Sequence, residues 1–141
     1  VKRAKRYRQP LCLLFLDLDG LKDINDRHGH KAGSEALRRV ASVIQAELGA
    51  SDIGARWGGD EFTIVAPNTS NNAAMSFAER IRSRIAEQRM DWRMTASIGV
   101  ATLGDNGNVM LEDASSLMRS ADAAMYYAKR SGKNTVAHAL S

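Results

Sequence analysis

The chain has 141 residues, of which 44% are hydrophobic and 26% charged, and these values are typical of one globular domain with its own core. They argue against a disordered chain, and the longest purely apolar run, residues 11–16, is far too short to cross a bilayer. The net charge of +4 comes largely from five Lys or Arg among the first eight residues, which indicates a solvated helix end more than a nucleic-acid-binding surface.

The cysteine content and the N-terminal residues bear on the cellular compartment. Cys12 is the single cysteine and lies inside an apolar run, so it excludes an internal disulfide. No segment resembles a signal peptide, because the basic start is followed by only a short apolar run before Asp17. We therefore expect a cytoplasmic domain without membrane contact of its own, in a protein whose other regions could be membrane-tethered.

The first half of the chain predicts a strand, a helix and a hairpin. Residues 11–18 form a continuous apolar run of strand length, typical of a strand buried on both faces, and a short helix can follow Asp19. Helical periodicity runs from Lys31 to Leu48, and Gly49 is placed to end that helix. Two short β-runs, residues 52–57 and 61–67, are separated by Gly58 and Gly59, a strong hairpin signal.

The second half predicts two more helices and two more strands. A helix follows the turn-rich residues 67–72 and continues to about Met90, residues 93–102 form a strand, and residues 104–108 form a loop. A third helix ends near Ser131-Gly132, and residues 134–139 make a closing strand. The third helix turns a stripe inward: Ala114, Leu117, Met118, Ala121, Met125 and Ala128. This order predicts an α/β (α+β) domain with one mixed or antiparallel sheet covered by helices.

Two acidic sites stand at the ends of β-runs. Asp17 follows six apolar residues, where a carboxylate is costly to bury unless it is paired or binds a cation. For Asp19 we favour a helix N-cap, although alternation puts it on the same face as Asp17. If the hairpin lies beside the first strand, Asp60 approaches Asp17, and a divalent ion would keep both ionised.

The ligand types available narrow the choice of metal and partner. Only oxygen ligands are offered, without a Cys or His cluster, which favours Mg²⁺ or Mn²⁺ over zinc. Because magnesium commonly completes its coordination with water and phosphate, a nucleoside triphosphate is the natural partner. Lys22, Lys129 and Lys133 are candidates to hold it, but lysines near a helix C-terminus also complement the helix dipole, and spacing alone leaves these two interpretations about equal.

Four ordered motifs together resemble the GGDEF domain of the diguanylate cyclase family. They are residues 17–33 (DLDGLKDINDRHGHKAG), 56–62 (RWGGDEF), 97–101 (SIGVA) and 121–134 (ADAAMYYAKRSGKN). The resemblance implies a fold related to polymerase palms and class III nucleotide cyclases. It also implies a reaction in which two nucleoside triphosphates, held by two facing domains of a homodimer, condense to a cyclic dinucleotide and pyrophosphate.

The resemblance also assigns residues to roles, position by position. It implies metal binding by Asp17, by the carbonyl of Leu18 and by Asp60. Asp60 would also help to activate the ribose 3′-hydroxyl. Glu61 is the second acid of the GGDEF motif and completes the pair with Asp60. The base would be read at Asn25, with His30 in the same motif. The triphosphate would be held by three lysines and two backbone N–H groups: Lys22, Lys129, Lys133, Gly20 and Leu21. Residues 1–10 would be the end of a linker helix from an upstream regulatory region, and residues 11–141 the catalytic domain.

The sequence departs from the family pattern at the base-reading position. Ser34 stands where the family has an aspartate that reads guanine, and a hydroxyl can donate or accept, so it tolerates either base. The same replacement resembles the hybrid promiscuous (Hypr) subgroup. We therefore expect GTP and ATP as substrates and 3′,3′-cyclic GMP-AMP as the main product, with cyclic di-GMP as co-product. The alternative is a conventional diguanylate cyclase in which Ser34 is a neutral N-cap variant.

A second departure lies before the hairpin. The family's RxxD inhibitory motif falls on residues 49–52, where Gly49 replaces the arginine and only Asp52 remains, so feedback inhibition there should be weak or absent. Two other classes are less favoured. A degenerate nucleotide-binding regulatory module would not be expected to retain Asp17, Asp60 and Glu61, and an RNA-binding domain would need interleaved aromatic residues that this chain lacks.

Overall fold

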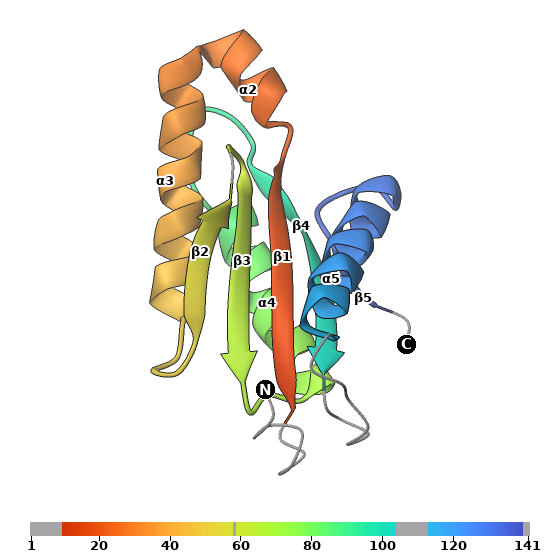
Figure 1. The fold of residues 1–141 in the computed structure, drawn as a ribbon. Coiled ribbons are helices and arrows are strands. Elements are labelled where there is room, and N and C mark those ends of the chain that lie inside the picture. The colour runs from red at the N-terminus through yellow and green to blue at the C-terminus, as the bar shows by residue number, and fades with distance from the viewer. Residues whose placement is uncertain (1–9, 58, 104–112, 140–141) are drawn as a thin grey trace.

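The protein forms a five-stranded sheet with helices on both faces (Figure 1). The computed structural model describes residues 10–57, 59–103 and 113–139. Its elements in chain order are β1 (Leu11–Asp19), α2 (Leu21–His28), α3 (His30–Glu47), β2 (Ile53–Trp57), β3 (Glu61–Pro67), α4 (Asn71–Ala86), β4 (Thr95–Leu103), α5 (Asp113–Arg130) and β5 (Val136–His138). The strand order is β2-β3-β1-β4-β5; only β4 and β5 pair in parallel. The α/β class with a mostly antiparallel, helix-covered sheet is confirmed.

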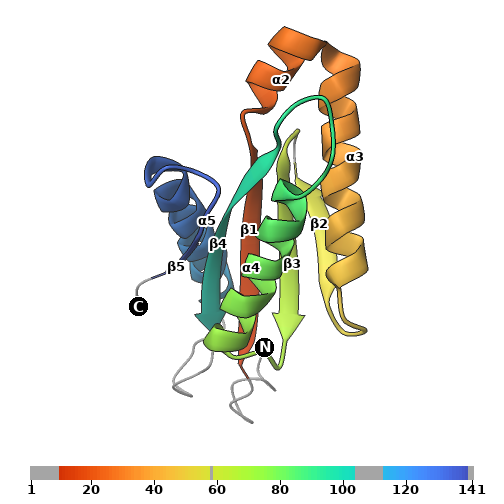
Figure 2. The same cartoon turned by 180° about the vertical axis from the view of Figure 1, so that it is seen from behind.

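Strand β1 lies at the centre and is buried on both faces, as its apolar run predicts. Its even-numbered side chains, Leu14 and Leu16 among them, belong to the larger core beneath α3 and α4, and its odd-numbered Leu13 and Phe15 belong to a smaller core beneath α5. The two views of the ribbon show α5 on one side of the sheet and α4 on the other (Figures 1 and 2). Because the side chains of a strand alternate between faces, one continuous apolar segment supplies both cores.

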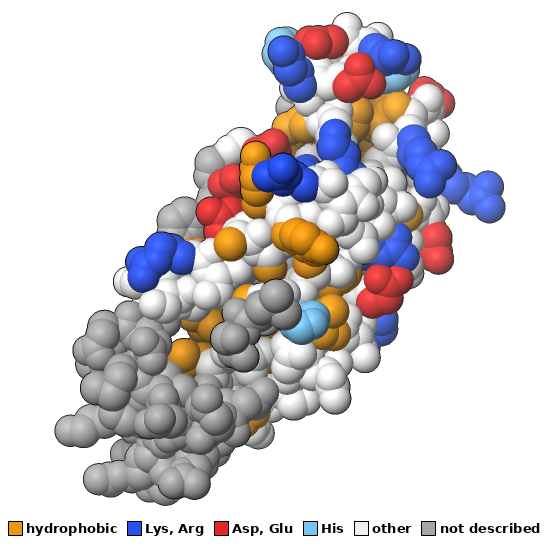
Figure 3. Space-filling view, turned by 90° about the vertical axis from the view of Figure 1, so that its right-hand side faces the viewer, with side chains coloured by type: hydrophobic (Ala, Val, Ile, Leu, Met, Phe, Trp, Pro, Cys, Tyr) orange, Lys and Arg blue, Asp and Glu red, His pale blue; other side chains and the backbone are white. Residues whose placement is uncertain are grey.

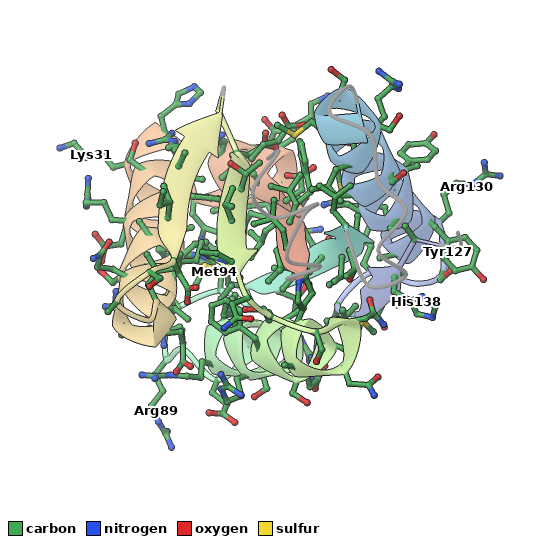
Figure 4. The ribbon with its side chains drawn as sticks, turned by 60° about the horizontal axis from the view of Figure 1, so that its bottom comes forward. Lys31, Arg89, Met94, Tyr127, Arg130 and His138 are labelled. Atoms are coloured by element: carbon green, nitrogen blue, oxygen red, sulfur yellow. The ribbon has the colours of Figure 1, made fainter. Side chains whose placement is uncertain are left out.

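Several predicted element boundaries differ from the structure. Helix α3 ends at Glu47 with Leu48 as an extended C-cap, and Gly49 follows directly but without the positive φ of a left-handed cap. Helix α4 ends at Ala86 rather than near Met90, and the chain then leads to Met94, which is 2% exposed and lies just before β4 (Figure 4). The strand predicted from residue 93 begins at Thr95, and the closing strand is only Val136–His138.

Some sequence predictions concern residues outside the described part of the chain. These are most of the linker segment, Gly58 of the hairpin, the loop at 104–108 and the side chain of Ala114. Within the described residues, none of the helices has the length and apolar character needed to span a bilayer.

Gly99 sets how closely α5 approaches the sheet. A Cβ built on Gly99 of β4 would lie 2.1 Å from the carbonyl oxygen of Ala121 and 2.2 Å from the backbone nitrogen of Met125. These are backbone atoms of α5, so no side-chain rotation relieves the contact. The glycine therefore allows α5 to lie directly on β4. This close packing also sets the distance between the last turns of α5 and the sheet.

We predict that Gly99→Ala lowers the free energy of unfolding by roughly 1–3 kcal/mol or more, since α5 must move to accommodate the methyl group. Urea denaturation is the measurement. Gly54→Ala on the edge strand β2 is the control, because its nearest neighbour is the flexible Leu48 side chain at 3.3 Å, and its effect should stay within about 0.5 kcal/mol. Equal effects of the two substitutions would contradict this account.

Candidate functional site

The structure brings the two acidic sites together at one end of the sheet. Strands β1 and β3 are antiparallel neighbours, and their register pairs Asp17 with Glu61. The Leu18 N–H donates to the Asp60 carbonyl oxygen at 3.3 Å, and the Asp60 carboxyl is near enough to contribute to raising the pKa of Asp17. The predicted convergence of Asp17 and Asp60 is therefore present in the structure, and Glu61 lies beside them.

Asp17 is in an unfavourable environment for a lone carboxylate. Its Oδ1 is buried and has no hydrogen-bond partner among the described residues. Burial raises the pKa of Asp17 to about 7; Lys129 opposes this rise, while the nearby Asp60 and Glu61 add to it. A cation bound between the acids would remove both the repulsion and the unpartnered oxygen.

Asp19 has a different role from the predicted one. The N-cap of α2 is Gly20, in the left-handed conformation at φ 70°, and no side chain caps the helix, so the N-cap assignment of Asp19 is wrong. Asp19 is instead the last residue of β1, 7% exposed, and its carboxylate accepts four hydrogen bonds. The donors are Ser97 Oγ at 2.7 Å, Thr95 Oγ1 at 2.8 Å, Lys129 Nζ at 2.8 Å and the Asn134 N–H at 2.9 Å.

These hydrogen bonds keep Asp19 ionised. Burial opposes ionisation, but the bonds from Lys129, Ser97, Thr95 and the Asn134 N–H outweigh it and lower the pKa of Asp19 below its usual value. Two carboxyls of one strand, Asp17 and Asp19, thus have pKa values displaced in opposite directions. The difference arises because Asp19 is fully hydrogen-bonded, whereas Asp17 is buried with an unpartnered oxygen and lies near other acids.

Lys129 reaches this cluster from the last turn of α5. Its Nζ lies 2.8 Å from Asp19 Oδ1, 3.2 Å from the Leu18 carbonyl oxygen and 3.6 Å from Asp17 Oδ2, and its side chain is 18% exposed. The close approach of α5 at Gly99 makes this reach possible. Lys129 is therefore part of the site in the structure, beyond any favourable effect on the helix dipole.

The other two predicted lysines lie at the surface. Lys22 is exposed in the first turn of α2, directly after Gly20 and Leu21. Lys133 is exposed in the turn after α5, at φ 63°, and its N–H donates to the Ala128 carbonyl oxygen. Since α5 ends at Arg130, Lys133 lies beyond the helix and does not share a helix face with Lys129. Neither lysine makes an ion pair within the described residues, so both are available to an anion.

The predicted base-reading residues lie on α2 and α3, which cross at Gly33. Asn25 of α2 lies against Gly33 of α3, because a Cβ on Gly33 would lie 1.8 Å from Asn25 Oδ1. Ser34 follows Gly33 and is exposed within α3, and His30 is exposed in the first turn. The N-cap of α3 is Gly29, so the alternative of Ser34 as an N-cap residue is wrong. Figure 3 shows charged side chains of both signs gathered at this end of the molecule, formed by α2 and the start of α3.

At the predicted inhibitory position, Asp52 forms hydrogen bonds within its own turn. Asp52 Oδ2 accepts a hydrogen bond from the Gly49 N–H at 2.7 Å, and the Asp52 N–H donates to the Gly49 carbonyl oxygen at 3.1 Å. This reciprocal pair closes the turn between α3 and β2. Asp52 thus has a structural partner inside its own loop.

The donor set fits a hard divalent cation. Within residues 10–57, 59–103 and 113–139 there is no group of three or more His, Cys, Asp or Glu side chains placed to hold a metal. The available ligands are two carboxylates and the Leu18 carbonyl, all oxygens, which suits Mg²⁺ or Mn²⁺ bound jointly with water and phosphate. The buried, unpartnered Oδ1 of Asp17 is the observation that supports this fit.

Sequence reasoning missed part of the site. Thr95, Ser97 and Asn134 hold Asp19, yet none of them was singled out. The one available signal was in the strand pattern: Thr95 and Ser97 alternate with apolar residues in β4, and Ser97 is fully buried. A buried hydroxyl inside a central strand needs a polar partner, although the pattern does not say which one.

Comparison with known proteins establishes the family. The family model "Diguanylate cyclase, GGDEF domain" matches residues 1–135. Diguanylate cyclase A of Treponema denticola is 40% identical over 141 residues, and diguanylate cyclase DosC of Escherichia coli is 39% identical over 142 residues; each alignment covers 96% of this chain. The chain belongs to the diguanylate cyclase GGDEF domain family. It spans only 37% and 30% of the length of these two relatives.

Solved structures agree in fold over nearly the whole chain. The GGDEF domain of DgcB from Caulobacter crescentus, in complex with c-di-GMP, has a TM-score of 0.89 and 32% identity over 99% of this chain and 84% of that one. The active GGEEF domain of a diguanylate cyclase from Vibrio cholerae also has a TM-score of 0.89, with 35% identity over 99% of this chain and 89% of that one. The GGDEF fold inferred from the motifs is confirmed.

We predict that Asp19→Asn lowers the free energy of unfolding by about 3 kcal/mol at neutral pH, because it removes the charge that Lys129 and three other donors surround. A carboxyl with a lowered folded-state pKa contributes stability that is present above its ordinary value of 3.8 and is lost as the pH falls through the folded value. The difference between the two proteins should therefore shrink on acidification.

Urea denaturation of both proteins, from neutral pH down to below the ordinary aspartate pKa of 3.8, is the measurement. Asp23→Asn is the control, because Asp23 forms only an exposed i,i+4 pair with Arg27, and it should change stability by less than about 0.5 kcal/mol. A difference between wild type and Asp19→Asn that does not vary with pH would contradict the assignment of Asp19 as the buried, ionised anchor.

Proposed function

We propose that this domain condenses two nucleoside triphosphates into a cyclic dinucleotide and releases pyrophosphate, in a Mg²⁺- or Mn²⁺-dependent reaction. The observation that carries the proposal is the convergence of Asp17, Asp60 and Glu61 at one sheet end, with a buried, unpartnered carboxylate oxygen on Asp17. Membership of the diguanylate cyclase family, and the names of relatives that cover 96% of this chain, support it.

In this proposal the residues of the chain divide into three tasks. Asp17, the Leu18 carbonyl and Asp60 hold the cation, and when bound the cation polarises the α-phosphate and stabilises the charge of the leaving pyrophosphate. Asp60, with Glu61 next to it in the hairpin, would accept the proton of the attacking ribose 3′-hydroxyl. The triphosphate is held by cationic side chains and by backbone N–H groups at the start of α2: Lys22, Lys129, Lys133, Gly20 and Leu21.

The proposed substrates are GTP and ATP, and the proposed main product is 3′,3′-cyclic GMP-AMP with cyclic di-GMP as co-product. Asn25 lies against Gly33, the residue before Ser34, and in this proposal Asn25 and Ser34 contact the same base. The Ser34 hydroxyl donates to adenine N1 or accepts from guanine N1–H, whereas a carboxylate could only accept. A conventional diguanylate cyclase that makes only cyclic di-GMP fits the family assignment equally well.

Assembly and regulation follow from the same reaction. One domain holds one nucleotide, so a second GGDEF domain of the same kind must face it, and residues 1–10 would join the domain to an upstream regulatory region. Product inhibition through residues 49–52 should be weak, because Gly49 offers no guanidinium and Asp52 is engaged within its turn. Titration of the reaction with cyclic di-GMP checks this point.

We predict that concentrated protein incubated with Mg²⁺, GTP and ATP yields a cyclic dinucleotide and pyrophosphate by mass spectrometry. Asp60→Asn should lower the rate roughly 100-fold or more, because it removes a cation ligand and proton acceptor, while exposed Asp91→Asn should leave the rate unchanged. Nucleotide binding without turnover by the wild-type protein, even when fused as a dimer, would instead favour a degenerate regulatory module.

We predict that Ser34→Asp shifts the products from cyclic GMP-AMP toward cyclic di-GMP when GTP and ATP are equal. Restoring a bidentate acceptor for guanine should add roughly 1–3 kcal/mol of base discrimination. Ser34→Ala is the matched control, since it removes the hydroxyl without adding an acceptor, and it should not restore guanine selectivity. If the wild-type protein and Ser34→Asp give the same product ratio, the assignment of Ser34 as the base-reading residue fails.

A further inference from the structure

We propose that the Lys129 ammonium occupies part of the cation site in the metal-free protein and competes with the divalent ion, which must displace it to bind. The inference rests on the proposed function for the existence of that ion. It goes further by assigning to Lys129 a second task, distinct from holding phosphate.

The contacts of Lys129 overlap with the proposed metal ligands. Its Nζ lies 3.2 Å from the Leu18 carbonyl oxygen and 3.6 Å from Asp17 Oδ2, and both groups belong to the set that would hold the cation. The third contact, at 2.8 Å, is with Asp19 Oδ1. The ammonium therefore supplies a positive charge to the same oxygens that a divalent ion would use.

A divalent ion and the ammonium are not compatible in these positions. Two cations that share the Leu18 carbonyl and flank Asp17 within a few ångströms repel each other, and this repulsion is strong because the lysine side chain is only 18% exposed. The divalent ion carries the larger charge and binds oxygen at shorter distances than an ammonium does. Ion entry should therefore move Lys129 away from Leu18 and Asp17.

Lys129 can leave without making Asp19 a buried, unpaired carboxylate. Asp19 Oδ1 keeps its bond from Ser97 Oγ at 2.7 Å, and Asp19 Oδ2 keeps its bonds from Thr95 Oγ1 at 2.8 Å and the Asn134 N–H at 2.9 Å. Each carboxylate oxygen thus retains a donor when the ammonium departs. Without these three donors the exchange would leave Asp19 buried and unpaired, which is strongly unfavourable.

The exchange gives the Asp17 environment two stable states. Without metal, the ammonium partly offsets the repulsion among Asp17, Asp60 and Glu61. With metal, the ion offsets it more fully, and the lysine is released from Leu18 and Asp17 and becomes available to a phosphate. The alternative is that Lys129 only holds the ligands in place, in which case its removal would weaken metal binding.

Titration of nucleotide-free protein with Mn²⁺, followed by electron paramagnetic resonance of the free ion, separates these alternatives. Lys129→Met and Lys129→Gln should bind Mn²⁺ more tightly than wild type, by roughly an order of magnitude, because a competing charge is gone. Arg130→Met is the matched control: it removes the same charge from the next residue, whose exposed side chain points away from the sheet (Figure 4). It should change the affinity by less than about twofold.

Each result has a distinct meaning. Unchanged or weaker Mn²⁺ binding by both Lys129 variants, with wild-type binding intact, would overturn the competition and leave the proposed function standing. Absence of Mn²⁺ binding by every nucleotide-free protein would also overturn the competition, and the assay of products from GTP and ATP would then decide the proposed function by itself. In wild-type protein, which needs no variant to fold, Mg²⁺ titration observed by ¹³Cε-lysine NMR should shift and sharpen the Lys129 resonance. A resonance that does not respond while Mg²⁺ binds would also overturn the inference.

Discussion

The site depends on crowding three acids at the end of a buried strand. Asp17 and Glu61 are directly opposite each other in the β1–β3 register, and Asp60 precedes Glu61 in the hairpin. The β1–β3 register and the hydrogen bond from the Leu18 N–H to the Asp60 carbonyl oxygen hold the three backbone positions close together. The cost is visible in the pKa of Asp17, which burial and its acidic neighbours raise to about 7 against the effect of Lys129. A site under this constraint favours any cation that can enter it.

The rest of the fold supplies and positions the charges that offset this crowding. Gly99 lets α5 lie against β4, which brings Lys129 to the end of β1. Thr95 and Ser97 of β4 and the Asn134 N–H donate hydrogen bonds that keep Asp19 ionised. Asp19 in turn binds the ammonium of Lys129. Helices α2 and α3 cross at Gly33, where the absence of a side chain leaves room for Asn25. The fold thus combines a cluster of three acids, a lysine held by Asp19, and the contact between helices α2 and α3.

Much of this arrangement was predictable because it depends on local patterns. The apolar run of β1 predicted a strand buried on both faces, and the glycine-rich hairpin predicted that Asp60 would approach Asp17. Asp19 was not predictable, because a carboxylate before a helix is most simply an N-cap and its actual partners come from two distant segments. The end of α4 was missed because no glycine or proline follows Ala86 to mark it before Met94 enters the core.

The central claim is that Asp17 is destabilised as a free carboxylate and requires a cation. The most direct test is a ¹³C-carboxyl NMR titration of Asp17 with and without Mg²⁺. We predict a pKa near the raised value of about 7 without the ion, and a value below the ordinary aspartate range when the ion is bound. An ordinary pKa without metal, or a raised pKa that Mg²⁺ does not lower, would contradict the account.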